Sequence, residues 1–271
     1  MTYLITGDVR DRRPLLVVQH VAWEGPHVIL DSFSDVSVLV RNTFDEAPRT
    51  PLPDPTTIRG ALFMGGPMSV NDADKLPPLA EEIAWLQRAV ALEVPILGVC
   101  LGAQLLAKAA GATITAAPHP EIGVAPIEIT DPHDPLVAHL APHADAMHWH
   151  GEQFTLPKDA VKLARSAQTE VQAFRLGTSA WGMLFHLEVD DDLLDTWLAE
   201  PSMAVEAERT LGNDYRELLR GGLPAVCPKR ARAVFDEFAT YCAQRRVAPE
   251  PARVDLPTRG WTRPTIASQP T

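Results

Sequence analysis

The chain has little of what ties a protein to a membrane or an oxidising compartment. It holds only three cysteines in 271 residues, Cys100, Cys227 and Cys242, and an odd number without regular spacing argues against a disulfide scaffold and for a reducing compartment. No apolar run approaches the roughly 18 residues of a membrane span. The opening stretch, MTYLITGDVRDRRP, lacks the apolar segment of a signal peptide. We therefore expect a cytoplasmic protein with no membrane partner.

Basic residues are also scarce. There are 24 Lys and Arg against 35 Asp and Glu, for a formal net charge of -11. A surface of that sign repels phosphate backbones, so we expect no nucleic-acid partner. The chain also lacks an internal repeat and a Gly-x-x-x-x-Gly-Lys-Ser/Thr phosphate loop. We expect a small-molecule substrate and no cofactor.

What the chain does have is an alternation of apolar runs and amphipathic stretches. Four early runs rich in Val, Ile and Leu predict strands at 14–20, 37–42, 60–66 and 94–100. Such runs are typical of strands covered on both faces, as in a parallel sheet. Helices are predicted at 77–92, which opens with two prolines, and at 101–110, which ends before Gly111. This alternation predicts an α/β fold with a three-layer, doubly wound, mostly parallel sheet.

The second half of the chain is predicted to complete this sheet and then to add helices. Residues 112–117 and 124–130 resemble a hairpin, and later strands are predicted at 160–166, 171–177 and 180–188. Extra C-terminal helices are predicted at 191–200, 204–222 and 229–246. We expect residues 1–200 to form one domain. Residues 201–271 are expected to form a helical extension and a proline-rich tail packed on it, with Trp261 available to a neighbour.

Cys100 stands where a nucleophile would. It lies in Gly98-Val99-Cys100-Leu101-Gly102, between a predicted strand and a predicted helix. A nucleophile elbow needs small flanking residues at such a turn, and open α/β sheets bind ligands at this edge. The helix N-terminus favours a thiolate over a thiol. The alternative is a small hydrophobic side chain in the core.

A thiolate nucleophile needs a base, and the base needs an orienting group. His186 and Glu188 lie two residues apart in a predicted strand, so both side chains can project from one face. The order of nucleophile, histidine and acid differs from that of the α/β-hydrolases. The HWHG segment (148–151) offers two histidines to a metal, but the sequence presents no convincing third ligand cluster, and we expect no metal site.

Four stretches, taken together and in order, resemble the class I, triad-type glutamine amidotransferases, in particular the stand-alone branch related to the glutaminase domain of GMP synthase. They are MGGPMSVND (64–72), PILGVCLGAQLLA (95–107), MHWHGEQFTLP (147–157) and GMLFHLEVD (182–190). The resemblance covers about residues 14–200 and implies a flavodoxin-like catalytic domain over residues 1–200. The family often has proline between the triad histidine and glutamate, where this chain has Leu187.

The resemblance implies roles for individual residues. Cys100 would be the nucleophile, His186 the acid and base, and Glu188 the orienting carboxylate. The remaining pocket positions that it implies, for the oxyanion hole and for substrate binding, are Gly65, Gly66, Leu101, Gln104, His150 and Gly151.

Three functions stay open at this point. The first is a glutaminase that passes ammonia to a synthetase bound in trans. The second is a self-sufficient hydrolase of a γ-glutamyl amine or peptide. The third is a non-catalytic scaffold that keeps the fold, and a homodimer is compatible with each of the three.

Overall fold

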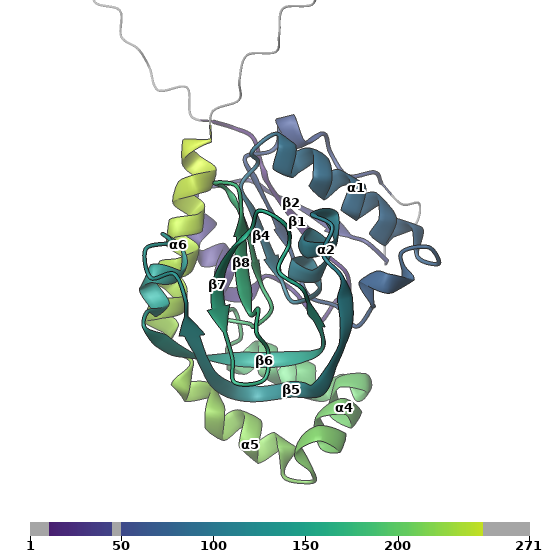
Figure 1. Cartoon of the computed structure of the whole chain (residues 1–271), viewed down its shortest axis with the longest axis vertical. Helices are drawn as coiled ribbons and strands as arrows, with labels where there is room; N and C mark the ends of the chain where they lie inside the picture. The colour runs from purple at the N-terminus through teal and green to yellow at the C-terminus, as the bar shows by residue number, and fades with distance from the viewer. Residues whose placement is uncertain (1–10, 45–49, 246–271) are drawn as a thin grey trace, which may run out of the picture.

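One mixed sheet forms the centre of the protein. The computed structural model describes residues 11–44 and 50–245, and within them a 9-stranded sheet has the order β2-β1-β3-β4-β9-β8-β7-β5-β6 (Figure 1). Its strands are β1 (Leu15–Gln19), β2 (Val38–Asn42), β3 (Gly60–Phe63), β4 (Ile96–Val99), β5 (Ile114–Ile129), β6 (His143–Phe154), β7 (Val161–Arg165), β8 (Ala173–Leu176) and β9 (Ala180–Met183).

The half of the sheet that holds the early strands is parallel. β2, β1, β3, β4 and β9 pair in parallel in that order, which is the flavodoxin-like arrangement. The strands β8, β7, β5 and β6 extend the sheet by antiparallel pairing. The predicted doubly wound α/β fold is therefore confirmed, with its parallel part at the core.

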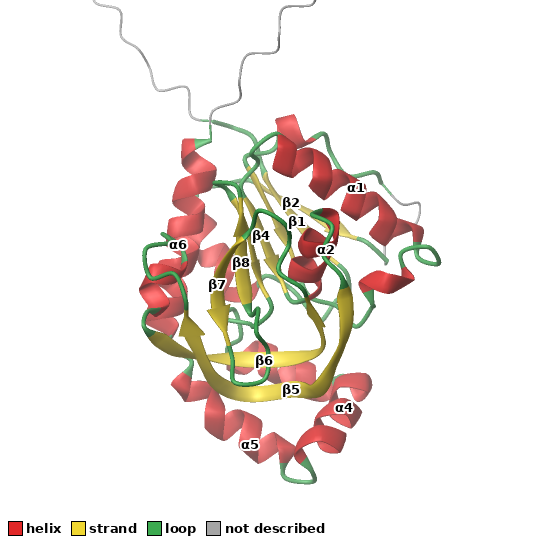
Figure 2. Cartoon of the chain, in the orientation of Figure 1, coloured by secondary structure: helices red, strands yellow, loops and turns green. Residues whose placement is uncertain are grey.

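Helices cover both faces of the sheet (Figure 2). On one face, α1 and α2 pack against side chains such as Leu16 and Phe63; on the other, α6 packs against a cluster that includes Leu15 and Trp181. The alternation along β1 follows from strand geometry, since neighbouring side chains point to opposite faces. The helices are α1 (Pro77–Ala91), α2 (Leu101–Ala109), α3 (Asp191–Ala199), α4 (Pro201–Leu211), α5 (Tyr215–Gly222) and α6 (Pro228–Gln244), and the 3-10 turns are η1 (His27–Phe33), η2 (Pro55–Thr57), η3 (Val70–Asp72), η4 (Val137–Leu140) and η5 (Leu223–Ala225).

The predicted hairpin between 112–117 and 124–130 is wrong. Both stretches belong to the single long strand β5, which bends and shifts register between Ala116 and Glu121 as it pairs with β6. Pro118 and Pro120 lie in that shift and resemble a turn in the sequence, because proline usually marks the end of a strand. In Figure 1, β5 and β6 curve together below the rest of the sheet.

Three further boundaries differ from the prediction. The helix expected over 204–222 is divided into α4 and α5 at Gly212, whose φ of 83° ends the first helix. The strand expected over 180–188 stops at Met183, beyond which His186 makes an isolated bridge with Met147. β2 is an edge strand with Val40 41% exposed, so it is not covered on both faces.

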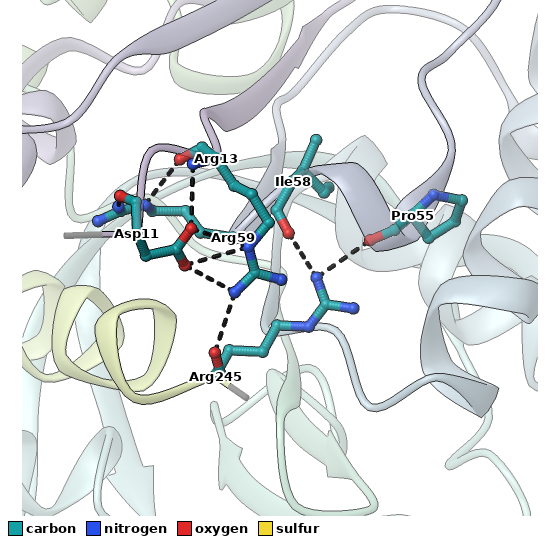
Figure 3. A network of polar contacts seen from close by, with 6 residues as sticks. All are labelled: Asp11, Arg13, Pro55, Ile58, Arg59 and Arg245. Carbon is teal, nitrogen blue, oxygen red and sulfur yellow. Dashed lines mark hydrogen bonds and ion pairs between the residues drawn. The ribbon is translucent and has the colours of Figure 1, made fainter. Parts of the chain in front are cut away.

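Polar contacts join the end of α6 to the beginning of the described chain. Arg13 donates a hydrogen bond to the carbonyl oxygen of Arg245 at 3.0 Å, and Arg245 donates to that of Pro55 at 3.0 Å (Figure 3). Arg59 completes the group through the carbonyl oxygens of Arg13 and Asp11. The tail that begins at 247, with Trp261, lies outside the described residues. Within the described parts of the chain, we find no helix of the length and apolarity that crossing a bilayer requires.

Candidate active site

Cys100 occupies a strained turn between β4 and α2. Its φ of 52° and ψ of -107° lie in a region that a residue with a Cβ seldom adopts. A Cβ on Gly98 would lie 2.5 Å from the carbonyl oxygen of Gly102, and one on Gly102 would lie 1.9 Å from that of Phe63. Both glycines are therefore required by the close approach of backbone segments, which is the geometry of a nucleophile elbow.

His186 and Glu188 lie beside this turn, as the sequence predicts. The Nδ1 atom of His186 is 2.6 Å from Oε1 of Glu188, and both side chains are buried. This contact leaves Nε2 of the imidazole for a second partner. The imidazole and the Cys100 thiol are close enough that each shifts the pKa of the other, while the one hydrogen bond of the sulfur within the described residues goes to the carbonyl oxygen of Trp149 at 3.7 Å. The structure thus brings the three predicted residues together.

Burial and the neighbouring charges shift the pKa values of His186 and Cys100. Burial disfavours the imidazolium, but the Glu188 carboxylate outweighs it, so the pKa of His186 is held well above its ordinary value. For Cys100 the helix N-terminus alone predicts a lowered pKa. Burial of the thiol, reinforced by the carboxylates of Glu24 and Glu188, instead raises the pKa of Cys100. Burial of the thiol thus opposes the effect of the helix N-terminus, and the sequence does not reveal this burial.

A pocket of about 340 Å³ opens over Cys100. Gln104, Gly66, His150 and Gly151 line it, as the resemblance implies. Leu101 and Gly65 are not among its lining residues. Neither the N–H of Gly66 nor that of Leu101 donates a hydrogen bond to any part of the chain that the structure describes. Two unused donors beside a nucleophile fit an oxyanion hole.

The pocket also contains residues that the sequence did not single out. Trp23 and Glu24 follow the first strand, and Ser202, Met203 and Glu206 come from α4. Trp23 and Glu24 had a detectable signal, because they lie just past a parallel strand, near the sheet edge that holds Cys100. The α4 residues had none, since only the packing of that helix brings them here.

The HWHG segment has an unexpected third neighbour. Glu121 on β5 pairs across the sheet with His150, and potential ligand atoms of Glu121, His148 and His150 lie within 4.8 Å of one another. The expectation that no third ligand accompanies the two histidines is therefore wrong, and these residues have the composition of a metal site.

The hydrogen bonds at Glu121 favour a polar network over a metal centre. Its carboxylate accepts hydrogen bonds from Ser166 at 2.7 Å, Thr169 at 2.6 Å and Gln172 at 2.8 Å, and lies 3.4 Å from His150. Burial favours the neutral acid, but the hydrogen bonds outweigh it and lower the pKa of Glu121 to about 2. A carboxylate with its lone pairs so occupied can hold the His150 wall of the pocket in place.

Known proteins share this fold and these motifs. The family model of glutamine amidotransferase class-I matches residues 30–200. Among solved structures, a glutamine amidotransferase from Thermotoga maritima superimposes with a TM-score of 0.76 at 24% identity, covering 86% of this chain and 99% of that one. One from Methylobacillus flagellatus has a TM-score of 0.73 at 27% identity, covering 88% and 98%.

Curated relatives agree with the family model. One of the subunits of the glutamine-hydrolyzing GMP synthase of Ignicoccus hospitalis is 33% identical over 142 residues, which cover 51% of this chain and 71% of that protein. The glutamine amidotransferase-like protein YfeJ of Salmonella typhimurium is 32% identical over 132 residues. This match covers 47% of the chain and only 55% of YfeJ. The chain belongs to the class I glutamine amidotransferase family.

Proposed function

We propose that the protein is a cysteine-dependent amidohydrolase that cleaves the side-chain amide of glutamine or of a γ-glutamyl amide. The observation that carries this proposal is that Cys100 lines an open pocket while electrostatically coupled to His186, whose Nδ1 is 2.6 Å from Glu188. A nucleophile, a base and an orienting group in this arrangement are the parts of a triad.

The chemistry runs in two halves. The Cys100 thiol gives its proton to His186 as the sulfur attacks the amide carbon, and the N–H groups of Gly66 and Leu101 stabilise the oxyanion. The imidazolium returns the proton to the leaving nitrogen, the C–N bond breaks, and a γ-glutamyl thioester is left on the sulfur. His186 then takes a proton from water, which attacks the thioester and releases glutamate and the thiol.

The raised pKa of Cys100 means that His186, as the base, must accept the thiol proton during the attack. A thiol whose pKa is raised by burial needs a base to take up its proton as the sulfur attacks. His186 can accept it because Glu188 stabilises the imidazolium that results. Glu188 acts through His186 and is a positioning residue in this scheme.

Cys100 can be tested by direct labelling. We expect a glutamine-like diazoketone to attach one adduct to the wild-type protein, detected by intact-mass spectrometry, and none to Cys100→Ala. Cys227→Ala is the matched control, because Cys227 is exposed and outside the pocket, and it should label like the wild type. Release of ammonia or amine by Cys100→Ala would refute the assignment of Cys100 as the nucleophile.

Glu188→Gln should lower kcat by about 100-fold or more while some turnover persists.

The nitrogen acceptor separates the two enzymatic alternatives. One of the relatives is part of a GMP synthase, which supports a synthetase partner bound in trans. Turnover of glutamine only when such a partner is added would favour that alternative, and brisk cleavage of a γ-glutamyl amine by the isolated protein would favour a self-sufficient hydrolase. A folded protein whose Cys100 resists the diazoketone would favour a scaffold.

We also propose a cytoplasmic location, because the three cysteines are all free, as is usual in a reducing compartment.

A further inference from the structure

One wall of the active-site pocket lies outside the segment matched by the family model. Trp23, Glu24, Ser202, Met203 and Glu206 line the pocket but fall before residue 30 or after residue 200. This set, which we call the outer wall, contains two carboxylates and an indole. Among the described residues that line the pocket there is no lysine or arginine.

Glu24 is the least satisfied member of the outer wall. The residue is only 9% exposed, its carboxylate keeps access to the pocket, and no hydrogen bond to it is found within the described part of the chain. The pKa of Glu24 is raised to about 7, because burial, together with the carboxylates of Glu188 and Glu206, outweighs the opposing effect of His186 and His20. A carboxyl group whose pKa is so strongly raised and which faces a pocket is a candidate for contact with a ligand.

The position of Glu24 identifies the part of the substrate that it would meet. A Cβ on Gly65 would lie 2.0 Å from Oε2 of Glu24 and 3.5 Å from Cε1 of His186. The carboxylate and the imidazole are therefore close neighbours on the same side of the Gly65 backbone, where a side chain at this position would project. Because His186 must protonate the leaving nitrogen, it lies on the leaving-group side of the scissile bond, and Glu24 lies on that side with it.

Glu206 and Trp23 continue the outer wall, and Trp149 of the matched segment lies beside them. Nε1 of Trp149 donates a hydrogen bond of 3.1 Å to Glu206, while the carbonyl oxygen of Trp149 is 3.7 Å from the Cys100 sulfur. One tryptophan thus links Glu206 to the nucleophile. Trp23 lines the pocket as well. Indole rings combined with carboxylates are the surroundings that bind organic ammonium groups.

We propose that the outer wall binds the leaving group of the substrate as a cation, so that the preferred substrate is a γ-glutamyl amide of a diamine or polyamine. This inference rests on the amidohydrolase chemistry proposed above. The amide C–N bond breaks, the leaving nitrogen takes the proton held by His186, and water supplies the hydroxyl of the new carboxylate. The distal ammonium is unchanged and needs no further reactant.

A matched substrate series tests the proposal. The compounds are γ-glutamyl-putrescine, its neutral isostere γ-glutamyl-n-pentylamide and the anionic γ-glutamyl-aminovalerate, each assayed for glutamate release. We expect kcat/KM for the cationic compound to exceed that for the neutral isostere by about 10- to 100-fold, the size of one charge-assisted contact in a buried site. Equal values for the three compounds would overturn the proposal.

Isosteric variants test whether the preference for the cationic compound arises from the outer wall. In Glu24→Gln and Glu206→Gln the ratio of kcat/KM between the cationic and neutral compounds should fall toward one. Glu208→Gln is the control, because it removes the same charge from an exposed position of α4 outside the pocket, and it should keep the wild-type ratio. A ratio unchanged in both pocket variants would contradict the proposal.

Two further measurements separate other outcomes. If the outer wall instead holds the α-ammonium of the glutamyl group, both pocket variants will weaken the cationic and neutral compounds equally, and the proposal fails. Binding of the series to Cys100→Ser by calorimetry needs no turnover. Tighter binding of the cation together with an inactive wild type would refute the proposed hydrolysis alone, whereas equal binding would refute the cation site.

Discussion

At the scale of single residues, the two acids nearest to His186 have opposite effects on the fold. Glu188 is 2.6 Å from the imidazole and stabilises its charge, whereas Glu24 is buried beside other carboxylates without a donor. The buried Glu24 carboxylate therefore lowers the stability of the fold, and such destabilising residues are common at functional sites.

The charge of Glu24 should cost stability at high pH. Its folded pKa of about 7 lies above its ordinary value of 4.5, so the folded state holds the proton more tightly than the unfolded state does. The stabilisation is complete at low pH and is lost as pH rises from 4.5 to about 7. At about pH 8, Glu24→Gln should therefore raise the free energy of unfolding by about 1–3 kcal/mol, with little gain at about pH 5.

Urea unfolding at the two pH values measures this difference. Glu208→Gln, which removes an exposed charge, should give the same small change at both. An equal gain for Glu24→Gln at both values would mean that its carboxylate does not carry the strain.

The sequence identified the residues with strong local signals and missed those placed by packing. Cys100 was predictable because glycines flank it, and His186 and Glu188 because their spacing fits one strand face. Glu24 was not, since its approach to His186 depends on how the segments that follow β1, β3 and β9 pack at Gly65. The neighbour that Glu121 offers to the HWHG histidines follows from strand register, which residue spacing does not reveal.

At the scale of elements, the junction of β4 and α2 decides where the nucleophile lies. The strand, the turn and the helix were all predictable from the apolar run and the two glycines. The continuous path of β5 was not, because its prolines fall at a bend that the β6 pairing tolerates. Local patterns identify elements, while pairing partners depend on the whole sheet.

Gly98→Ala should damage this junction. The new methyl group would meet backbone atoms of Gly102 at 2.5 Å, which cannot move without shifting α2. We expect a loss of about 1–3 kcal/mol in the free energy of unfolding from such overpacking, measured by urea denaturation, and slower labelling of Cys100. Gly221→Ala is the same change in open space on α5 and should be neutral or slightly stabilising. Equal stabilities of Gly98→Ala and Gly221→Ala would show that the β4–α2 junction can accommodate the extra methyl group.

At the scale of the whole molecule, the C-terminal helices share a core with the sheet. Phe238 on α6 is fully buried and makes edge contacts with Phe33 and Trp181, with ring centroids 6.1 Å and 6.4 Å away. The Arg13 and Arg245 contacts of Figure 3 fasten the far end of the same helix. We propose that residues 201–245 form an extension of the 1–200 domain that does not unfold separately.

Phe238→Ala tests this shared core. Removing a buried aromatic ring should lower the free energy of unfolding by about 3–5 kcal/mol. If the extension and the sheet are one unit, helical circular dichroism and tryptophan fluorescence will report the same single transition. Leu218→Ala, at a side chain 55% exposed on α5, should change little. An early loss of helical signal, followed by a separate fluorescence change, would argue for two units.

The origin of the outer wall has an evolutionary consequence. Its side chains come from a short loop after β1 and from α4, while the elbow, His186 and Glu188 belong to the segment that the family model matches. Under the hydrolysis proposed above, mutations in the outer wall would change which amine is released and leave Cys100, His186 and Glu188 unaltered. Grafting that loop and α4 from one homologue onto another should transfer its preference, which makes these two pieces the natural targets for redesign.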